Sequence, residues 1–159
     1  IAQGLNDFVP VKGRSRAFSM HCAGRDITVV DDTYNANPDS MRAAIDVLAE
    51  LPAPRLLVLG DMGEVGDQGP AFHAEVGHSA RAAGIEQLIA LGPQSQGAVA
   101  AFGPAGWHGQ DMAAVQAQVL AAVQAGVASV VVKGSRSMRM EQVVQALQAA
   151  SAQQGAGVC

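Results

Sequence analysis

The chain has 159 residues and a net charge of −4, and 49% of its residues are apolar, 15% charged and 4% aromatic. This length suits a single domain with a full hydrophobic core. The negative charge argues against nucleic acid and anionic membranes as partners, and no apolar run is long enough to span a bilayer. The two cysteines, Cys22 and Cys159, lack metal-binding or redox spacing, so we expect a cytoplasmic protein.

The predicted elements alternate between strands and helices. The apolar runs 15–22 and 26–31 are separated only by a short turn with a glycine, which predicts a hairpin whose first strand is the antiparallel edge. After it, each strand-like run is followed by a helical pattern. The expected helices cover 38–50, 70–83, 94–102, 111–125 and a last segment ending near 150; the expected strands cover 55–59, 87–91, a short stretch near Trp107, and 129–133.

This alternation predicts an α/β fold: a Rossmann-like, doubly wound, mostly parallel sheet of about six strands with one antiparallel edge strand. Right-handed crossovers put every strand-to-helix loop on the same rim of such a sheet. Three of these loops are unusually polar, namely 31–37, 60–69 and 133–139. We therefore expect these three loops to converge on one ligand.

The most informative loop is 31–37, which reads Asp-Asp-Thr-Tyr-Asn-Ala-Asn and joins an apolar strand to a helix. Asn37 suits the N-cap of that helix and Pro38 suits its first position. A purely structural turn would need the cap and the proline, but not the two acids, the tyrosine and the second asparagine before them. The loop is therefore a candidate ligand-binding segment, at the strand ends where open α/β sheets bind ligands.

Several familiar motifs are absent from the sequence. There is no Gly-x-x-x-x-Gly-Lys-[Ser/Thr] phosphate loop, no Gly-x-Gly-x-x-Gly at the first crossover, no Gly-x-Ser-x-Gly elbow and no histidine pair with zinc spacing. The chain therefore reads as a nucleotide or substrate domain whose phosphate-binding residues lie elsewhere.

Three runs together resemble the C-terminal domain of the Mur ligases, the ATP-dependent ligases that build the peptidoglycan stem peptide. The runs are 31–37, 59–66 (Leu-Gly-Asp-Met-Gly-Glu-Val-Gly) with His73 nearby, and 132–137 (Val-Lys-Gly-Ser-Arg-Ser). The lead-in 8–14 is similar to the family's passage from its central to its C-terminal domain. The first and third runs are typical of the family branch that adds D-alanyl-D-alanine.

The resemblance covers essentially residues 5–148 and implies one domain of a three-domain enzyme. In the family, an N-terminal domain binds the UDP-sugar, and a central domain holds the P-loop, Mg2+ and a modified lysine. The C-terminal domain closes over ATP and admits the incoming amino acid or dipeptide. We therefore expect a connector over 1–14, the domain over 15–150, and a frayed tail over 151–159.

The reaction that the resemblance implies forms a peptide bond. The terminal carboxylate of UDP-N-acetylmuramoyl-tripeptide is activated by ATP as an acyl phosphate. The amine of D-alanyl-D-alanine then attacks it, and phosphate leaves. We expect this chain to be a monomeric fragment that is inactive alone, because the ATP phosphate and Mg2+ ligands belong mainly to the central domain.

For ATP, the resemblance implies four residues. Asp32 would accept hydrogen bonds from the ribose hydroxyls, and Arg14 would reach the phosphates across the domain cleft. Asn35 is the better ligand candidate of the two asparagines, because Asn37 is explained as the helix cap. Tyr34 would contact ATP by stacking or through its hydroxyl, although a packing role under the loop explains it equally well.

For the dipeptide, the candidates lie in two loops. Arg136 carries a planar fork that matches a carboxylate, with Ser135 and Lys133 beside it. Ser137 is better explained as the cap of the last helix.

The second loop offers acids for the dipeptide ammonium group. Asp61 and Glu64 are the candidates, although either could simply fix the loop. His73 is a weak candidate for a general base, since a histidine near a helix start more often only hydrogen-bonds locally. No metal ligand is expected in this chain.

Two alternatives remain open on the sequence. One is a stand-alone, non-catalytic, Rossmann-like nucleotide-binding module, which the absence of an upstream P-loop would favour. The other is the same domain of a sister Mur ligase that adds a different residue. The 133–136 loop argues against the sister enzyme, because a site for an acidic or diamino side chain should present other charges there.

Overall fold

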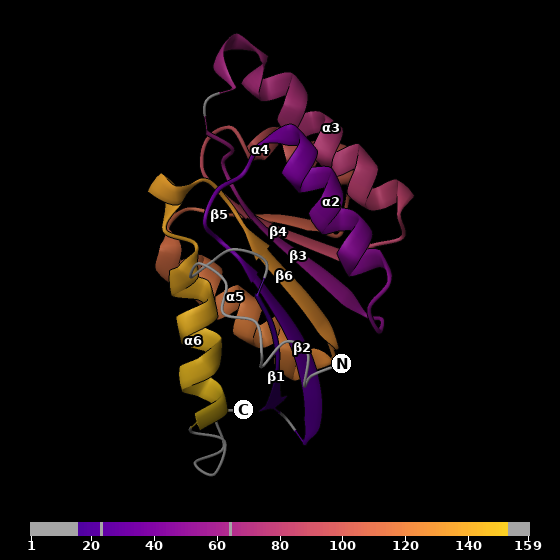
Figure 1. Ribbon diagram of the computed structural model, residues 1–159, viewed down its shortest axis with the longest axis vertical. Helices are drawn as coiled ribbons and strands as arrows, with labels where there is room; N and C mark the ends of the chain where they lie inside the picture. Colours follow the sequence, from indigo (N-terminus) through magenta and orange to yellow (C-terminus); the bar gives the residue numbers. More distant parts are fainter. Residues whose placement is uncertain (1–15, 23, 64, 153–159) are drawn as a thin grey trace.

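Six strands form one sheet with the order β1-β2-β6-β3-β4-β5 (Figure 1). The computed structural model describes residues 16–22, 24–63 and 65–152. The strands are β1 (Arg16–Cys22), β2 (Arg25–Asp32), β3 (Arg55–Gly60), β4 (Gln87–Leu91), β5 (Gly106–Gly109) and β6 (Ser129–Lys133). The helices are α2 (Pro38–Ala49), α3 (Gly69–Ala82), α4 (Gln96–Phe102), α5 (Met112–Ala125) and α6 (Glu141–Ala152), with 3-10 turns η1 (Gly66–Gln68) and η2 (Arg136–Met138).

The strand pairing matches the predicted fold class. β1 pairs with β2 in the antiparallel sense, whereas β2 with β6, β6 with β3, β3 with β4, and β4 with β5 are all parallel. In this register Asp32, the last residue of β2, lies directly opposite Lys133, the last residue of β6. The loops that follow these two neighbouring strands therefore start side by side on the same rim.

Local sequence signals explain where the helices begin and end. The side chain of Asn37 accepts a hydrogen bond from the Ser40 backbone N–H at 2.8 Å and Pro38 follows it, which caps α2 as predicted. Asp111 caps α5 in the same way, by accepting from the Ala114 N–H. Gly84 adopts a positive φ of 86° just after α3, a conformation that glycine takes without a steric penalty.

The last helix follows the predicted loop 133–139, but one residue of that loop differs from the expectation. The chain first forms η2 and then passes through Arg139 in the left-handed conformation, so α6 begins only at Glu141. Ser137 lies inside η2, and its Oγ is 3.1 Å from the Oγ of Ser135. The expectation that Ser137 caps the last helix is therefore wrong.

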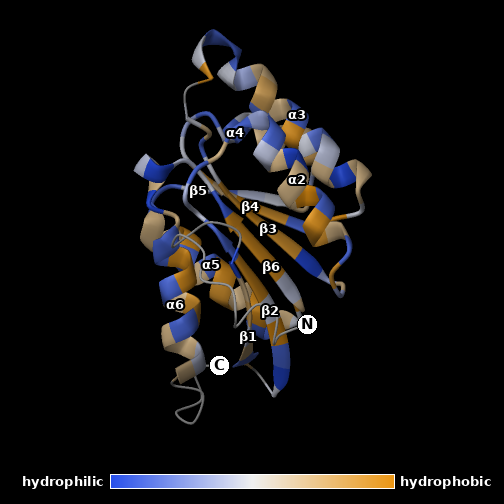
Figure 2. Ribbon diagram, viewed as in Figure 1, coloured by the Kyte–Doolittle hydropathy of each residue, from blue (hydrophilic) through white to orange (hydrophobic). Residues whose placement is uncertain are grey.

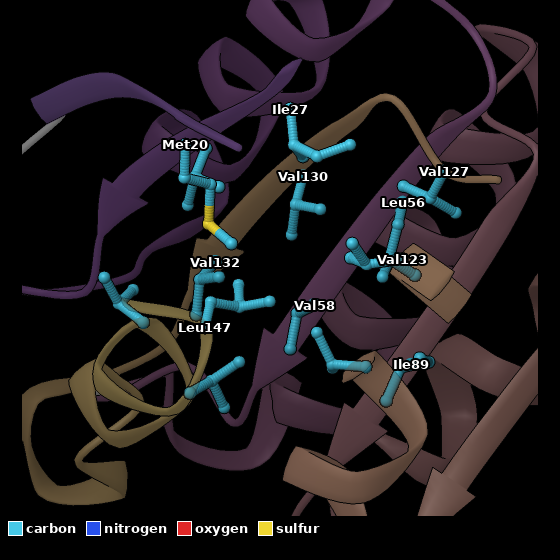
Figure 3. Packing of buried hydrophobic residues seen from close by; sticks show 14 of the residues in the cluster. Met20, Ile27, Leu56, Val58, Ile89, Val123, Val127, Val130, Val132 and Leu147 are labelled. Carbon is cyan, nitrogen blue, oxygen red and sulfur yellow. The ribbon is translucent and has the colours of Figure 1, made fainter. Parts of the chain in front are cut away.

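The core has two halves, one on each face of the sheet. Helices α5 and α6 cover one face, where Val123 of α5 and Leu147 of α6 belong to the same buried cluster as Val58, Val130 and Val132 of the sheet (Figure 3). Helices α2, α3 and α4 cover the other face around Leu57 and Leu59. The central strands are apolar on both faces, as parallel strands covered by helices are, and polar residues gather at the loops (Figure 2). Within the described ranges, no helix combines the length and apolar character needed to cross a bilayer.

Candidate functional site

The three polar loops predicted to converge do meet on one rim of the sheet. The Gly63 N–H donates to the Ala36 carbonyl at 3.3 Å, which joins the loop after β3 to the loop after β2. The Ser135 N–H donates to the Asp61 carbonyl at 2.9 Å, which joins the loop after β6 to the loop after β3. The loop after β3 is thus hydrogen-bonded to both of the other loops, and the loop after β6 follows the strand that lies between β2 and β3.

At the strand ends, Lys133 and Asp32 form an ion pair. The Lys133 Nζ donates to Asp32 Oδ2 at 2.9 Å and to the Asn35 carbonyl at 3.0 Å. The Lys133 side chain is only 2% exposed and that of Asp32 13%. A buried ammonium group is costly unless it is paired and hydrogen-bonded, and these two contacts supply the pairing.

A cavity of about 380 Å³ opens beside this ion pair, between α2 and the β1 side of the sheet. Its polar end is formed by Asp32, Lys133, Tyr34 and Asn35, so three of the four residues predicted to bind ATP share one cavity. Its remaining wall is largely apolar. That wall consists of Ala17, Val30, Ala43, Ala44, Val47 and Val131, together with Asn37 and Ser40. An apolar cavity with a few convergent polar groups at one end is typical of small-molecule sites.

Arg136, the predicted carboxylate-binding residue, lies against the nucleotide loop. Its guanidinium carbon is 5.1 Å from the centre of the Tyr34 ring, within the range of a cation–π contact. Arg136 is exposed and Tyr34 is half-buried. The two side chains therefore form a second connection between the loop after β6 and the loop after β2, in addition to the Lys133–Asp32 pair.

The Asp61 carboxylate is hydrogen-bonded to other residues of the fold. Its Oδ1 accepts hydrogen bonds from the Ser95 N–H at 2.8 Å and from the Ser95 hydroxyl at 2.7 Å, and its Oδ2 accepts from the Gln94 N–H at 3.2 Å. Both Asp61 and Ser95 are buried. This geometry favours the structural reading of Asp61, in which its carboxylate anchors the loop before α4 to the loop after β3.

The His73 side chain is hydrogen-bonded to two backbone groups. The Met62 N–H donates to its Nε2 at 3.0 Å, so its Nδ1 carries the proton and donates to the Gly69 carbonyl at 2.7 Å. The side chain is fully buried. Because both ring nitrogens are occupied, this geometry favours local hydrogen bonding over a general-base role.

Asp31 is likewise held inside the fold. It is 1% exposed, accepts a hydrogen bond from the Thr33 hydroxyl at 2.7 Å, and lies 3.5 Å from an Arg16 guanidinium nitrogen. These contacts fix the first turn of the loop after β2. Of the two neighbouring acids, Asp31 and Asp32, it is Asp32 that borders the cavity.

Two predicted site residues, Arg14 and Glu64, lie outside the described residues. The sequence reading missed Ser95, because the loop that carries it looked plain, and it missed Ala43 and Val47 as cavity wall. Val47 offers a signal that the sequence does contain, since it is a large apolar residue of α2 outside the buried stripe of Met41, Ala44, Ile45 and Leu48. The structure leaves it 49% exposed. In the described parts of the chain, no group of three or more acids, histidines or cysteines could hold a metal ion.

Comparison with known proteins identifies the family. The model of the family described as "Mur ligase, glutamate ligase domain" matches residues 16–136. The chain is 43% identical over 149 residues to the UDP-N-acetylmuramoyl-tripeptide–D-alanyl-D-alanine ligase of Escherichia coli (strain K12), covering 93% of this chain and 32% of that protein. It is 37% identical over 152 residues to the ligase of the same name from Haemophilus influenzae, covering 92% and 32%. The chain thus spans about a third of the length of these relatives.

Solved structures agree with the sequence relatives. A crystal structure of MurF from Acinetobacter baumannii superposes with a TM-score of 0.80 at 29% identity, over 92% of this chain and 33% of that one. The MurF ligase of Thermotoga maritima in complex with ADP superposes with a TM-score of 0.72 at 22% identity, over 89% and 32%, and shows the shared fold. The chain belongs to the Mur ligase family, as a C-terminal, glutamate ligase domain.

Proposed function

We propose that this chain is the C-terminal domain of an ATP-dependent ligase that joins D-alanyl-D-alanine to UDP-N-acetylmuramoyl-tripeptide through an acyl phosphate. The observation that carries the proposal is the convergence of the loops after β2 and β6 on one rim. There, Lys133 bonds to Asp32 while Arg136 lies over Tyr34. The names of the E. coli and H. influenzae relatives supply the two substrates that are joined. ATP and the acyl phosphate come from the resemblance to the Mur ligases.

The nucleotide side of the proposed site is the cavity beside α2. An ionised carboxylate held at a strand end suits the vicinal hydroxyls of a ribose, and Asp32 is such a group. Asn35 and Tyr34 border the same cavity, and its apolar wall suits the face of a nucleoside base. We assign to Arg14 the neutralisation of phosphate charge from the connector.

The dipeptide side is the surface around η2. Arg136 would grip the terminal carboxylate with two parallel N–H donors, with the Ser135 hydroxyl next to it. Glu64 is the remaining candidate for the ammonium group, since the Asp61 carboxylate already accepts three hydrogen bonds from the loop before α4. Holding the amine and the ATP-activated carboxylate together lowers the entropic part of the barrier.

As the family resemblance implies, we assign Mg2+ binding, and the phosphate contacts other than that of Arg14, mainly to the central domain of the ligase. Mg2+ would neutralise the ATP phosphates during formation of the acyl phosphate. The part of this chain is to position the ribose and the dipeptide. A cytoplasmic location follows from the proposed substrates, which are nucleotide-linked precursors and ATP.

The experiment that tests this proposal has two steps. The genomic reading frame upstream of Ile1 should encode a P-loop, and the full-length ligase should be purified and its ATP kinetics measured for Asp32→Ala. A charge-assisted bond to a ribose hydroxyl contributes about 1.5–3 kcal/mol, so the KM for ATP should rise about tenfold or more, while kcat falls less. A reading frame without a P-loop would favour the nucleotide-binding module. An unchanged ATP KM would make Asp32 only a turn residue.

A further inference from the structure

Among the residues that the structure describes, Lys133 is the largest side chain that is almost completely buried. It ends β6, the strand at the middle of the sheet between β2 and β3, and the residue is 1% exposed. Neighbouring strands and the start of the loop after β2 surround it, and its Nζ contacts Asp32 and the Asn35 carbonyl. In this position its ammonium group is not presented to a ligand on the outer surface of the rim.

The two contacts of Lys133 span the loop that we assign to ATP. Asp32 is the residue opposite Lys133 in the β2–β6 register, and Asn35 lies three residues farther along that loop. One ammonium group thus fixes both the carboxylate at the start of the loop and the backbone near its middle. The distances of 2.9 and 3.0 Å are normal for charge-assisted hydrogen bonds.

We propose that Lys133 is a positioning residue for the nucleotide: it orients the Asp32 carboxylate and the Asn35 backbone toward the ribose, and does not contact the dipeptide. This inference rests on the proposed role of Asp32. In this proposal, one residue of the loop after β6 acts on ATP and another acts on the dipeptide. Lys133 points inward to the ATP loop, whereas Arg136, three residues on, is exposed and available to a carboxylate.

The division predicts opposite kinetic signatures for the two cations. Lys133→Met removes the charge and keeps an unbranched side chain of similar length. It should raise the KM for ATP several-fold, up to the rise of about tenfold or more expected for Asp32→Ala, because the carboxylate that binds the ribose is no longer held in place. The dipeptide KM should stay within about twofold. Arg136→Ala, the matched comparison from the same loop, should raise the dipeptide KM and leave the ATP KM nearly unchanged.

The decisive experiment compares ATP with 2′-deoxy-ATP in the full-length ligase. The ratio of kcat/KM for the two nucleotides is measured for wild type, Asp32→Ala, Lys133→Met and the double variant. A residue that only stabilises the fold would lower both values together and leave the ratio unchanged. If Lys133 acts through Asp32, each single variant should lower the preference for ATP several-fold, and the double variant should lower it no further than Asp32→Ala alone.

The outcomes separate this inference from the function on which it rests. If Asp32→Ala lowers the ratio but Lys133→Met does not, or if Lys133→Met raises the dipeptide KM, the positioning role is overturned while the ribose contact survives. If Asp32→Ala leaves the ratio unchanged, the ribose contact itself is wrong, and the inference falls with it. Breaking a buried pair can destabilise the fold. If Lys133→Met shows no cooperative melting, Lys133→Gln is used in its place. The same decrease in the kcat/KM ratio of ATP to 2′-deoxy-ATP is then expected of Lys133→Gln.

Discussion

At the scale of single residues, we propose that the guanidinium of Arg136 selects the dipeptide. D-alanyl-D-alanine offers two methyl groups, one amide, an ammonium group and a carboxylate, and two methyl contacts supply little specificity. We predict that Arg136→Ala raises the dipeptide KM at least about tenfold. Arg136→Lys should recover only part of this loss, since a point charge replaces two directed bonds. Steady-state kinetics with varied dipeptide would check both; an unchanged KM would place the carboxylate elsewhere.

Tyr34 belongs to both proposed subsites, since it borders the cavity and its ring makes a cation–π contact with Arg136. If the ring acts by holding the guanidinium, Tyr34→Phe should keep the wild-type dipeptide KM. Tyr34→Leu should raise it about two- to fivefold, which corresponds to the 0.5–1 kcal/mol of an exposed cation–π contact. Equal losses in the two variants, measured by the same assay, would instead assign the role to the hydroxyl.

At the scale of elements, the close approach of β3 and β6 sets the shape of the rim. A Cβ added at Gly134 would lie 2.6 Å from Met140 Cγ, and 3.1 Å and 3.2 Å from the Cα and N of Gly60. The backbone of β3 cannot yield as a flexible side chain can. Gly134→Ala should therefore displace the residues on either side of it, Lys133 and Ser135, and destabilise the chain by about 1–3 kcal/mol.

Urea unfolding of the purified chain would measure this effect. Gly97→Ala is the matched control, because a Cβ at this position in α4 meets nothing closer than 3.6 Å. Alanine also has the higher helix propensity, so this variant should be neutral or up to about 1 kcal/mol more stable. Equal stability of the Gly134→Ala protein and wild type would show that the two strand ends have room to separate.

The ion pair between Arg55, at the start of β3, and Glu86, just before β4, makes the stability of the folded chain depend on pH. Hydrogen bonds from the Arg55 side chain lower the pKa of Glu86 in the folded chain. The unfolded chain therefore binds the proton more readily than the folded chain. The ionised Glu86 adds to the free energy of unfolding above the ordinary carboxyl pKa of about 4–4.5, and this stabilisation is lost as the pH falls through the lower pKa of the folded state.

We predict that Glu86→Gln lowers the Tm at pH 7 and that the difference from wild type disappears in acid. The effect at pH 7 should be small, since the Glu86 side chain is 38% exposed. Glu50→Gln is the control, because within the described ranges no cation pairs with the exposed Glu50. Melting curves from pH 7 to pH 3 would show the trend, and a constant Glu86→Gln difference over that range would contradict it.

At the scale of the whole molecule, local patterns predicted the order of strands and helices and the antiparallel edge, because hydrophobic periodicity and caps are local signals. The shared rim also followed from topology alone. Side-chain partners did not follow, because Lys133 and Asp32 are 101 residues apart in the chain and Asp61 and Ser95 are 34 apart. The expected cap at Ser137 was wrong because the sequence does not show that η2 and the left-handed Arg139 separate this residue from α6.

The central claim is that this fold, within its full-length enzyme, presents D-alanyl-D-alanine to an ATP-activated carboxylate. Its most direct measurement is phosphate release and product mass from the full-length protein, with ATP, Mg2+, UDP-N-acetylmuramoyl-tripeptide and a panel of amine donors. The account predicts that phosphate and the peptide product appear together with D-alanyl-D-alanine, and not with D-glutamate or a diamino acid. Ligation of one of those donors in preference to the dipeptide, or nucleotide binding without any ligation, would contradict it.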